Sequence, residues 1–162
     1  MAIPGYVDLQ VNGHIGVDFS SNKLNYDDFC RAAEALFEAE TVVFLPTVIT
    51  STYELYRRNC ALIQDAVERN GWQKQIPGIH LEGPFISAEP GAVGCHNPDW
   101  VAEPDLGLID ELGSIIKMIT VAAEVPGITD FIKGAVERGL IVSLGHQNAG
   151  TEDLQRAEAA GA

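Results

Sequence analysis

The sequence predicts an α/β protein in which a parallel sheet is covered by helices. Apolar, β-branched runs alternate along the chain with amphipathic segments of helical spacing. Strands of nearly continuous apolar sequence, separated by helices, are typical of parallel sheets that are buried on both faces. We therefore expect five strand–helix units in chain order. Their strands are expected at 6–11, 41–45, 76–83, 115–122 and 140–144.

The segments between these runs carry signals for helix ends. Ser51 or Thr52 is expected to cap the second helix through its hydroxyl oxygen. Pro126 suits the first turn of a later helix, where a missing N–H does no harm. A polar loop rich in Gly and Pro is expected at 87–104, and a last helix at 152–160.

Polar residues at the ends of the apolar runs favour a barrel over an open doubly wound sheet. No glycine-rich phosphate-binding fingerprint follows the first run, which weakens the open-sheet alternative. In a (β/α)8 barrel the chemistry sits at the carboxyl ends of the strands. A closed barrel needs eight strands, so five units predict a partial TIM (β/α)8-type barrel. The polar residues at run ends are Gln10, Asn12, Thr47, Glu82, Glu124 and His146.

Composition excludes several classes of partner. The formal net charge is −13, with 23 acidic and 10 basic residues, which is the wrong sign for binding nucleic acid or an anionic membrane. No stretch reaches the roughly 18 apolar residues of a membrane span. Three widely spaced cysteines make a poor disulfide framework. With no visible signal peptide, these features predict a cytoplasmic protein.

Glu82 and His146 are the first candidates for a metal site. Each follows an apolar run, and a carboxylate buried there is costly unless it is paired or binds a metal. Taken alone, each is more often a structural residue. Because the ends of barrel strands face one mouth, together they supply two of the three ligands of a His₂Glu catalytic zinc site.

Four motifs, in order along nearly the whole chain, resemble one family. They are PGYVDLQVNG at 4–13, LPTVIT at 45–50, HLEGPF at 80–85 with GCHNP at 94–98, and SLGHQNA at 143–149. In these motifs the chain is similar to the N-acetylglucosamine-6-phosphate deacetylases of the amidohydrolase superfamily. The resemblance implies that the substrate is N-acetylglucosamine 6-phosphate.

The resemblance also implies roles for individual residues. Glu82 and His146 would bind one divalent metal ion, most simply zinc, and His96 would touch the sugar. Gln10 and Asn12 stand where many amidohydrolases carry a His-x-His pair, which implies a single metal because neutral amides are poor zinc ligands. Gln10 would then hold a water near the metal. Asn12 and Gly83 complete the set of residues expected around the substrate.

The implied reaction is hydrolysis of the N-acetyl group to glucosamine 6-phosphate and acetate. In the family, a histidine on strand six completes the metal site and an aspartate on strand eight is the general base. Both would lie beyond residue 162, as would the last barrel strands, and the flanking β-sandwich is not recognisable in the sequence. We therefore expect 1–162 to be one fragment of the barrel, with no catalytic base of its own and little activity alone.

Three further expectations remain open at this point. The chain could act on another amide, although the His-Asn-Pro loop at 96–98 argues against it. A non-catalytic barrel scaffold is the alternative from a different class. Because strands one and five would be open, apolar edges, we also expect it to form homo-oligomers.

Overall fold

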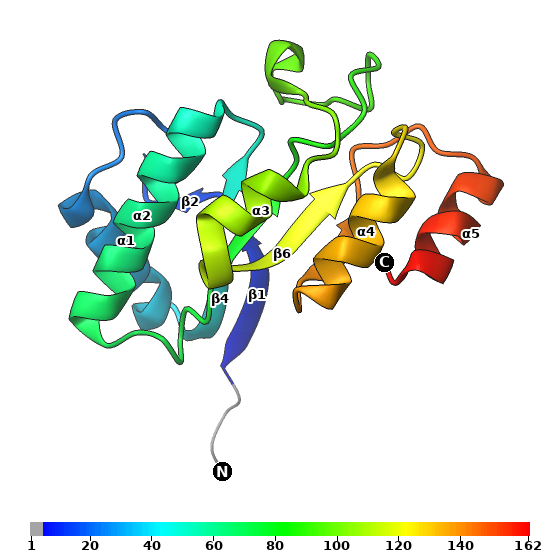
Figure 1. The fold of residues 1–162 in the computed structure, drawn as a ribbon. Coiled ribbons are helices and arrows are strands. Elements are labelled where there is room, and N and C mark those ends of the chain that lie inside the picture. The colour runs from blue at the N-terminus through cyan, green and yellow to red at the C-terminus, as the bar shows by residue number, and fades with distance from the viewer. Residues whose placement is uncertain (1–4) are drawn as a thin grey trace.

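A parallel five-stranded sheet forms the centre of the computed structural model, which describes residues 5–162 (Figure 1). Its strands are hydrogen-bonded in the order β1-β4-β5-β6-β7, so that each strand lies next to its neighbour in the chain order. Every pairing in this sheet is parallel. The strands are β1 (Tyr6–Val11), β4 (Thr41–Ile49), β5 (Ile79–Glu82), β6 (Ile116–Val121) and β7 (Ile141–Leu144), and a separate antiparallel pair is formed by β2 (Gly13–His14) and β3 (Val17–Asp18).

Helices connect successive strands and pack on the outer face of the sheet (Figure 1). Thr52 caps α2, where its Oγ1 accepts a hydrogen bond from the N–H of Leu55 at 3.3 Å, one of the two caps expected. The helices are α1 (Tyr26–Glu38), α2 (Tyr53–Asn70), α3 (Leu106–Leu112), α4 (Ile128–Glu137) and α5 (Thr151–Ala160), with 3₁₀ turns η1 (Pro98–Trp100) and η2 (Gly113–Ile115).

The expectation that Pro126 lies in the first turn of a helix is wrong. The N-cap of α4 is Gly127, which has a φ of 80°, and the helix begins at Ile128. A left-handed residue between the proline and the helix interrupts the right-handed backbone, so Pro126 belongs to the preceding turn.

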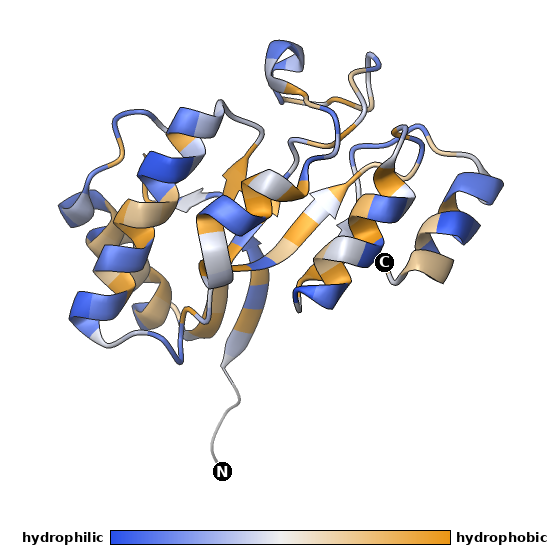
Figure 2. Cartoon of the chain, viewed as in Figure 1, coloured by the Kyte–Doolittle hydropathy of each residue, from blue (hydrophilic) through white to orange (hydrophobic). Residues whose placement is uncertain are grey.

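The hydrophobic core lies between the sheet and the helices. Alternation along β5 directs Ile79 and Leu81 into this core, where both are fully buried. His80 and Glu82 therefore face the opposite, concave side. Figure 2 shows the same division on the helices, whose apolar residues turn toward the sheet while their charged residues turn outward.

The sheet curls as part of a (β/α)8 barrel, which confirms the predicted fold class. Within residues 5–162, β1 and β7 each pair with one neighbouring strand. The outermost strands consequently leave large apolar side chains exposed. Val7 on β1 is 62% exposed, Leu9 is 50% exposed, and Ile141 on β7 is 60% exposed.

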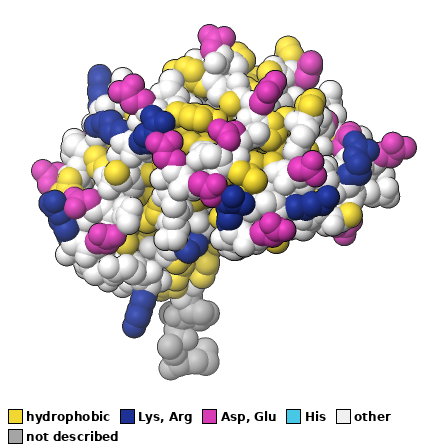
Figure 3. All heavy atoms as spheres, viewed as in Figure 1, with side chains coloured by type: hydrophobic (Ala, Val, Ile, Leu, Met, Phe, Trp, Pro, Cys, Tyr) yellow, Lys and Arg dark blue, Asp and Glu magenta, His cyan; other side chains and the backbone are white. Residues whose placement is uncertain are grey.

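The remaining surface is mixed, with apolar side chains such as Val42 and Trp100 exposed among polar ones. Asp and Glu side chains are spread over the face shown in Figure 3, with Lys and Arg between them. Among the helices of residues 5–162, none has the length and apolar character needed to cross a membrane.

Candidate metal centre at the carboxyl ends of the strands

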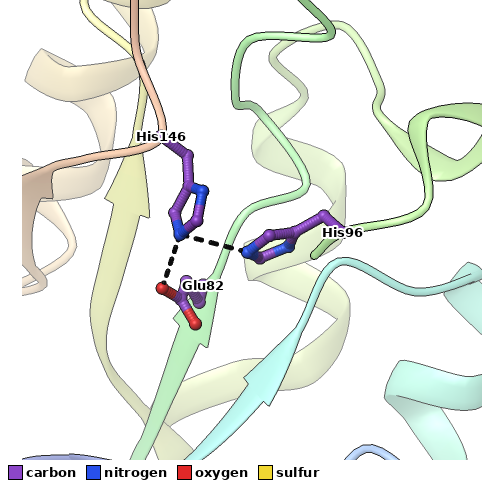
Figure 4. Close-up of side chains that lie close together, drawn as sticks. All are labelled: Glu82, His96 and His146. Carbon is purple, nitrogen blue, oxygen red and sulfur yellow. Dashed lines mark hydrogen bonds and ion pairs between the residues drawn. The ribbon is translucent and has the colours of Figure 1, made fainter. Parts of the chain in front are cut away.

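Three side chains that are far apart in the sequence converge above the sheet (Figure 4). Glu82 is the last residue of β5, His96 comes from the loop after β5, and His146 follows β7. One ligand atom from each lies within 4.8 Å of the others. His146 Nε2 is 2.9 Å from Glu82 Oε1 and 3.2 Å from His96 Nε2. The structure thus places Glu82 and His146 together, and it adds His96 to the same group.

The backbone at His146 is in an unusual conformation. Its φ is 50°, in the left-handed region that costs residues other than glycine roughly 1–3 kcal/mol. Two hydrogen bonds hold it there: Gly145 donates its N–H to the Val121 carbonyl at 3.0 Å, and Ser87 donates to the His146 carbonyl at 2.9 Å. This turn ends β7 abruptly and directs the imidazole toward Glu82.

Hydrogen bonding fixes which nitrogen of His146 faces the cluster as a ligand. Nδ1 lies 3.1 Å from the carbonyl oxygen of Ala92, which can only accept, so Nδ1 carries the proton. In the neutral ring Nε2 then has a free lone pair, and it faces the lone pairs of Glu82 Oε1 at 2.9 Å. Two acceptors at this distance require a proton or a cation between them. A backbone carbonyl that orients a histidine in this way is typical of metal sites.

Glu82 is buried but remains a carboxylate. Burial by itself would raise its pKa, but the neighbouring side chains of Asn12, Gln10 and His146 outweigh burial and hold the pKa below its usual value. Asn12 Nδ2 donates to Oε2 at 3.2 Å. Since Oε2 is engaged by Asn12, Oε1 is the oxygen that faces His146.

His96 is buried within the cluster, although the sequence placed it in a loop. Burial, and then the neighbouring His146, lower its pKa and favour the neutral ring. The backbone N–H of Thr50 donates to Nδ1 at 3.3 Å, and Thr50 Oγ1 lies 2.8 Å from the same nitrogen. Because the backbone N–H can only donate, it favours the tautomer with the proton on Nε2. His96 is then a hydrogen-bond donor aimed into the cluster.

Thr50 was not among the residues singled out from the sequence. It ends the LPTVIT motif, and only the fold brings it against both the His96 loop and β5. Its Oγ1 also lies 3.2 Å from the carbonyl oxygen of Glu82, so its single proton has two acceptors within reach, that oxygen and His96 Nδ1. Thr50 therefore contacts both Glu82, the candidate metal ligand, and His96, the candidate hydrogen-bond donor.

Gly83 has a steric reason to be glycine. Its φ is 90°, and a Cβ at this position would lie 2.1 Å from Thr50 Oγ1. Its N–H donates to the Thr120 carbonyl at 2.9 Å, so the Gly83 N–H already has a hydrogen-bond partner within the protein. Gly83 thereby allows the chain after Glu82 to pass close to β4.

The other polar residues at strand ends lie outside this cluster. Thr47 Oγ1 donates to the Leu45 carbonyl at 3.2 Å. Glu124 Oε1 accepts the N–H of Asn148 at 2.6 Å, and its other carboxylate oxygen is buried without a partner. These contacts account for Thr47 and for one of the two carboxylate oxygens of Glu124.

The donor set fits a zinc-like ion. One carboxylate oxygen and imidazole nitrogens are ordinary zinc ligands, and bonds of about 2.0–2.1 Å at tetrahedral angles place ligand atoms roughly 3.3 Å apart. The distance of 2.9 Å between Glu82 Oε1 and His146 Nε2 is close to that separation. Residues Glu82 and His146 could therefore hold one divalent ion, with His96 beside it.

Comparisons with known proteins give a consistent result. No model of a protein family matches the chain. The N-acetylglucosamine-6-phosphate deacetylase of Caenorhabditis elegans is 34% identical over 161 residues, covering 90% of this chain and 37% of the relative. The human enzyme of the same name is 32% identical, covering 96% of this chain and 38% of the relative. The chain thus spans about two fifths of the length of these relatives.

Solved structures agree with the sequence relatives. The crystal structure of N-acetylglucosamine-6-phosphate deacetylase from Pasteurella multocida superposes with a TM-score of 0.87 at 31% identity, covering 98% of this chain and 41% of that one. A mutant of the Mycobacterium smegmatis enzyme, in complex with N-acetyl-D-glucosamine-6-phosphate, superposes with a TM-score of 0.86 at 28% identity, covering 99% of this chain and 41% of that one. By motif order, sequence and fold together, the chain matches one part of the barrel of the N-acetylglucosamine-6-phosphate deacetylases.

Proposed function

We propose that this chain supplies the metal-binding part of an active site that hydrolyses N-acetylglucosamine 6-phosphate to glucosamine 6-phosphate and acetate. The observation that carries the proposal is the pair formed by Glu82 Oε1 and His146 Nε2, which face each other at 2.9 Å with the His146 Nδ1 proton held by the Ala92 carbonyl. The relatives named above carry the same activity in their names. A neighbour of the same fold is solved with this substrate.

Glu82 and His146 are proposed as ligands of one divalent ion, with zinc as the simplest choice. When bound, such an ion polarises the acetyl carbonyl and lowers the pKa of water. The chain's own residues set the geometry around it. Asn12 keeps Glu82 Oε2 engaged so that Oε1 is presented. Gln10 and Asn12 line the same side of the cluster, where we propose that they contact water or substrate.

His96 is proposed as a donor to the substrate. With Nδ1 accepting from the Thr50 N–H, its Nε2–H can donate to the acetyl oxygen, where negative charge develops during hydrolysis. Burial keeps the ring in place. We therefore expect His96 to affect turnover more than metal binding.

Proton transfer requires a group outside the cluster. The resemblance implies an aspartate from a later strand, so we propose that the 162-residue polypeptide binds the ion weakly and turns over slowly. A positioned base typically contributes about 10²–10⁴-fold in rate. With two ligands from this chain, against the three usual at a catalytic zinc, weak binding follows.

Metal binding is the direct test of the proposal. Isothermal titration with Zn²⁺, and Co²⁺ as a spectroscopic substitute, should give one site per chain that Glu82→Gln and His146→Ala each abolish. Glu124→Gln is the matched control, since Glu124 is a strand-end carboxylate outside the cluster. Circular dichroism should confirm that every variant is folded. Binding that survives both Glu82→Gln and His146→Ala would contradict the assignment and favour a non-catalytic scaffold.

Acetate release tests the substrate. A coupled acetate assay with N-acetylglucosamine 6-phosphate should give a slow rate that depends on added metal and disappears in Glu82→Gln. N-Acetylglucosamine without the phosphate is the control substrate. An equal rate with unphosphorylated sugar or a simple acetamide would favour the alternative of a different amide substrate.

We further propose that the protein is cytoplasmic and that it self-associates. All three cysteines, Cys30, Cys60 and Cys95, are free thiols, which suits a reducing compartment. The exposed apolar side chains of β1 and β7 support association, because unpaired strand edges with apolar residues readily pair with another chain.

A further inference from the structure

His80 is a buried histidine to which the proposed function gives no role. It is 1% exposed and lies two residues before Glu82 on β5, on the same concave face of the sheet. Its ring reaches across the interior to β1 and β6, and Nδ1 also lies 3.4 Å from Thr47 Oγ1 on β4. Nδ1 lies 2.9 Å from the carbonyl oxygen of Leu9 on β1, and Nε2 lies 2.8 Å from Thr120 Oγ1 on β6.

These contacts determine the tautomer of His80. The Leu9 carbonyl can only accept, so Nδ1 carries the proton. In the neutral ring Nε2 then accepts from the Thr120 hydroxyl. His80 therefore donates to β1 and accepts from β6.

The Leu9–Gln10 peptide that receives this donor lies at an irregularity of β1. The β1–β4 register shifts between Asp8 and Val11, and the residue opposite Val11 is Pro46, which has no N–H. Gln10 donates its N–H to Asp8 Oδ1 at 3.0 Å. Both polar groups of this one peptide are thus bonded to side chains. The carbonyl accepts from His80 on the concave face, and the N–H donates to the exposed Asp8.

The same peptide leads directly to the residues that contact Glu82. Gln10 is its second residue, and Asn12 follows two residues later to donate to Glu82 Oε2 at 3.2 Å. Where the β1 ladder is irregular, the carbonyl of Leu9 is tied to His80 on the strand that also carries Glu82. Besides its pairing with β4, β1 is therefore joined by the His80 ring to the strand that carries Glu82.

We propose that His80 is a positioning residue: through Nδ1 it holds the Leu9–Gln10 peptide and so places Gln10 and Asn12 against Glu82, which determines the oxygen that Glu82 presents. The effect on metal binding rests on the proposed function. The placement of Asn12 does not, and it can be measured without any metal.

Two substitutions separate the two nitrogens of the ring. In His80→Asn, the amide nitrogen is bonded to Cγ, as Nδ1 is in histidine, and can still donate to Leu9. In His80→Gln, the amide is one bond further out and lies nearer the position of Nε2. If His80 only filled space, His80→Gln would be tolerated better than His80→Asn, because glutamine is closer to histidine in length, or the two variants would behave alike.

Nuclear magnetic resonance on the metal-free chain provides the first readout. Long-range ¹⁵N correlation spectra should show His80 as the Nδ1–H tautomer. The side-chain NH₂ signals of Asn12 should show protection from exchange in the wild type and in His80→Asn, and should lose it in His80→Gln. An Nε2–H tautomer, or equal Asn12 protection in both variants, would overturn the proposal.

Cobalt binding provides the second readout. Partners that orient metal ligands typically contribute about 10–100-fold in metal affinity. We expect His80→Gln to weaken Co²⁺ binding by about 10-fold or more, and His80→Asn to stay within about 3-fold of wild type. Equal affinities in the two variants would overturn the positioning role. A wild type that binds no Co²⁺ would instead refute the metal site, while the tautomer and the Asn12 signals would still decide the role of His80.

Discussion

Replacing Gly83 by alanine should destabilise the protein through a contact that can be isolated. Gly83 has a φ of 90°, and a Cβ there would lie 2.1 Å from Thr50 Oγ1. The next nearest atoms are Thr50 Cβ at 3.4 Å and Ile86 Cγ2 at 3.6 Å, which are ordinary contacts. The hydroxyl must therefore move, although it bonds to the carbonyl of Glu82 and lies against His96.

The expected magnitude has two parts. A left-handed backbone costs an alanine about 1–2 kcal/mol relative to glycine. Crowding a closely packed site costs typically about 1–3 kcal/mol more. The free energy of unfolding should fall by roughly 2–5 kcal/mol, a large share of the ~5–15 kcal/mol of an ordinary domain. With a urea dependence of about 2 kcal/mol per M, the middle of the usual range, the unfolding midpoint should fall by roughly 1–2.5 M.

Urea unfolding followed by circular dichroism measures this change, and Gly91→Ala is the matched control. Gly91 has a φ of 93°, but nothing lies within 4 Å of a Cβ built on it, so only the backbone contribution applies. Combining Gly83→Ala with Thr50→Ala removes the crowded atom and should return the extra cost to the level of Gly91→Ala. If Gly83→Ala costs no more than Gly91→Ala in the wild-type background, the steric argument is refuted.

Further expectations concern His96, the thiols and the open edge. His96→Ala should lower the rate of acetate release by about 10²-fold, as for other lost oxyanion donors. It should lower Zn²⁺ affinity far less than His146→Ala does. If the two variants lost affinity equally, His96 would be a metal ligand. Burial raises the pKa of Cys60 to about 12. In the folded protein at pH 8, a thiol reagent should therefore modify exposed Cys95 rapidly and Cys60 only after unfolding. Rapid modification of Cys60 would contradict its burial. Val7→Lys should reduce self-association measured by sedimentation, because a charge on an exposed edge opposes strand pairing, and an unchanged sedimentation coefficient would show that β1 is not the contact.

Much of the architecture could be read from the residues alone. Nearly continuous apolar runs and amphipathic segments of helical spacing are local patterns, and they predict the five parallel strands and the helices between them. Glu82 and His146 could be identified as candidate ligands for a related reason. A polar residue directly after an apolar run is conspicuous in one dimension, and parallel strands bring such residues to one edge of the sheet.

Other features depend on contacts that no local pattern encodes. His96 and Thr50 are 46 residues apart, and only the folded loop brings Thr50 Oγ1 within 2.8 Å of the imidazole. His80 lies within an apolar run, and only the structure places its ring between β1 and β6 on the concave face. The sequence therefore determined the order of the strands and the chemical types at their ends. Which nitrogen carries a proton, and which oxygen of Glu82 is free, were decided by tertiary structure, because each depends on a hydrogen-bond partner contributed by another strand or loop.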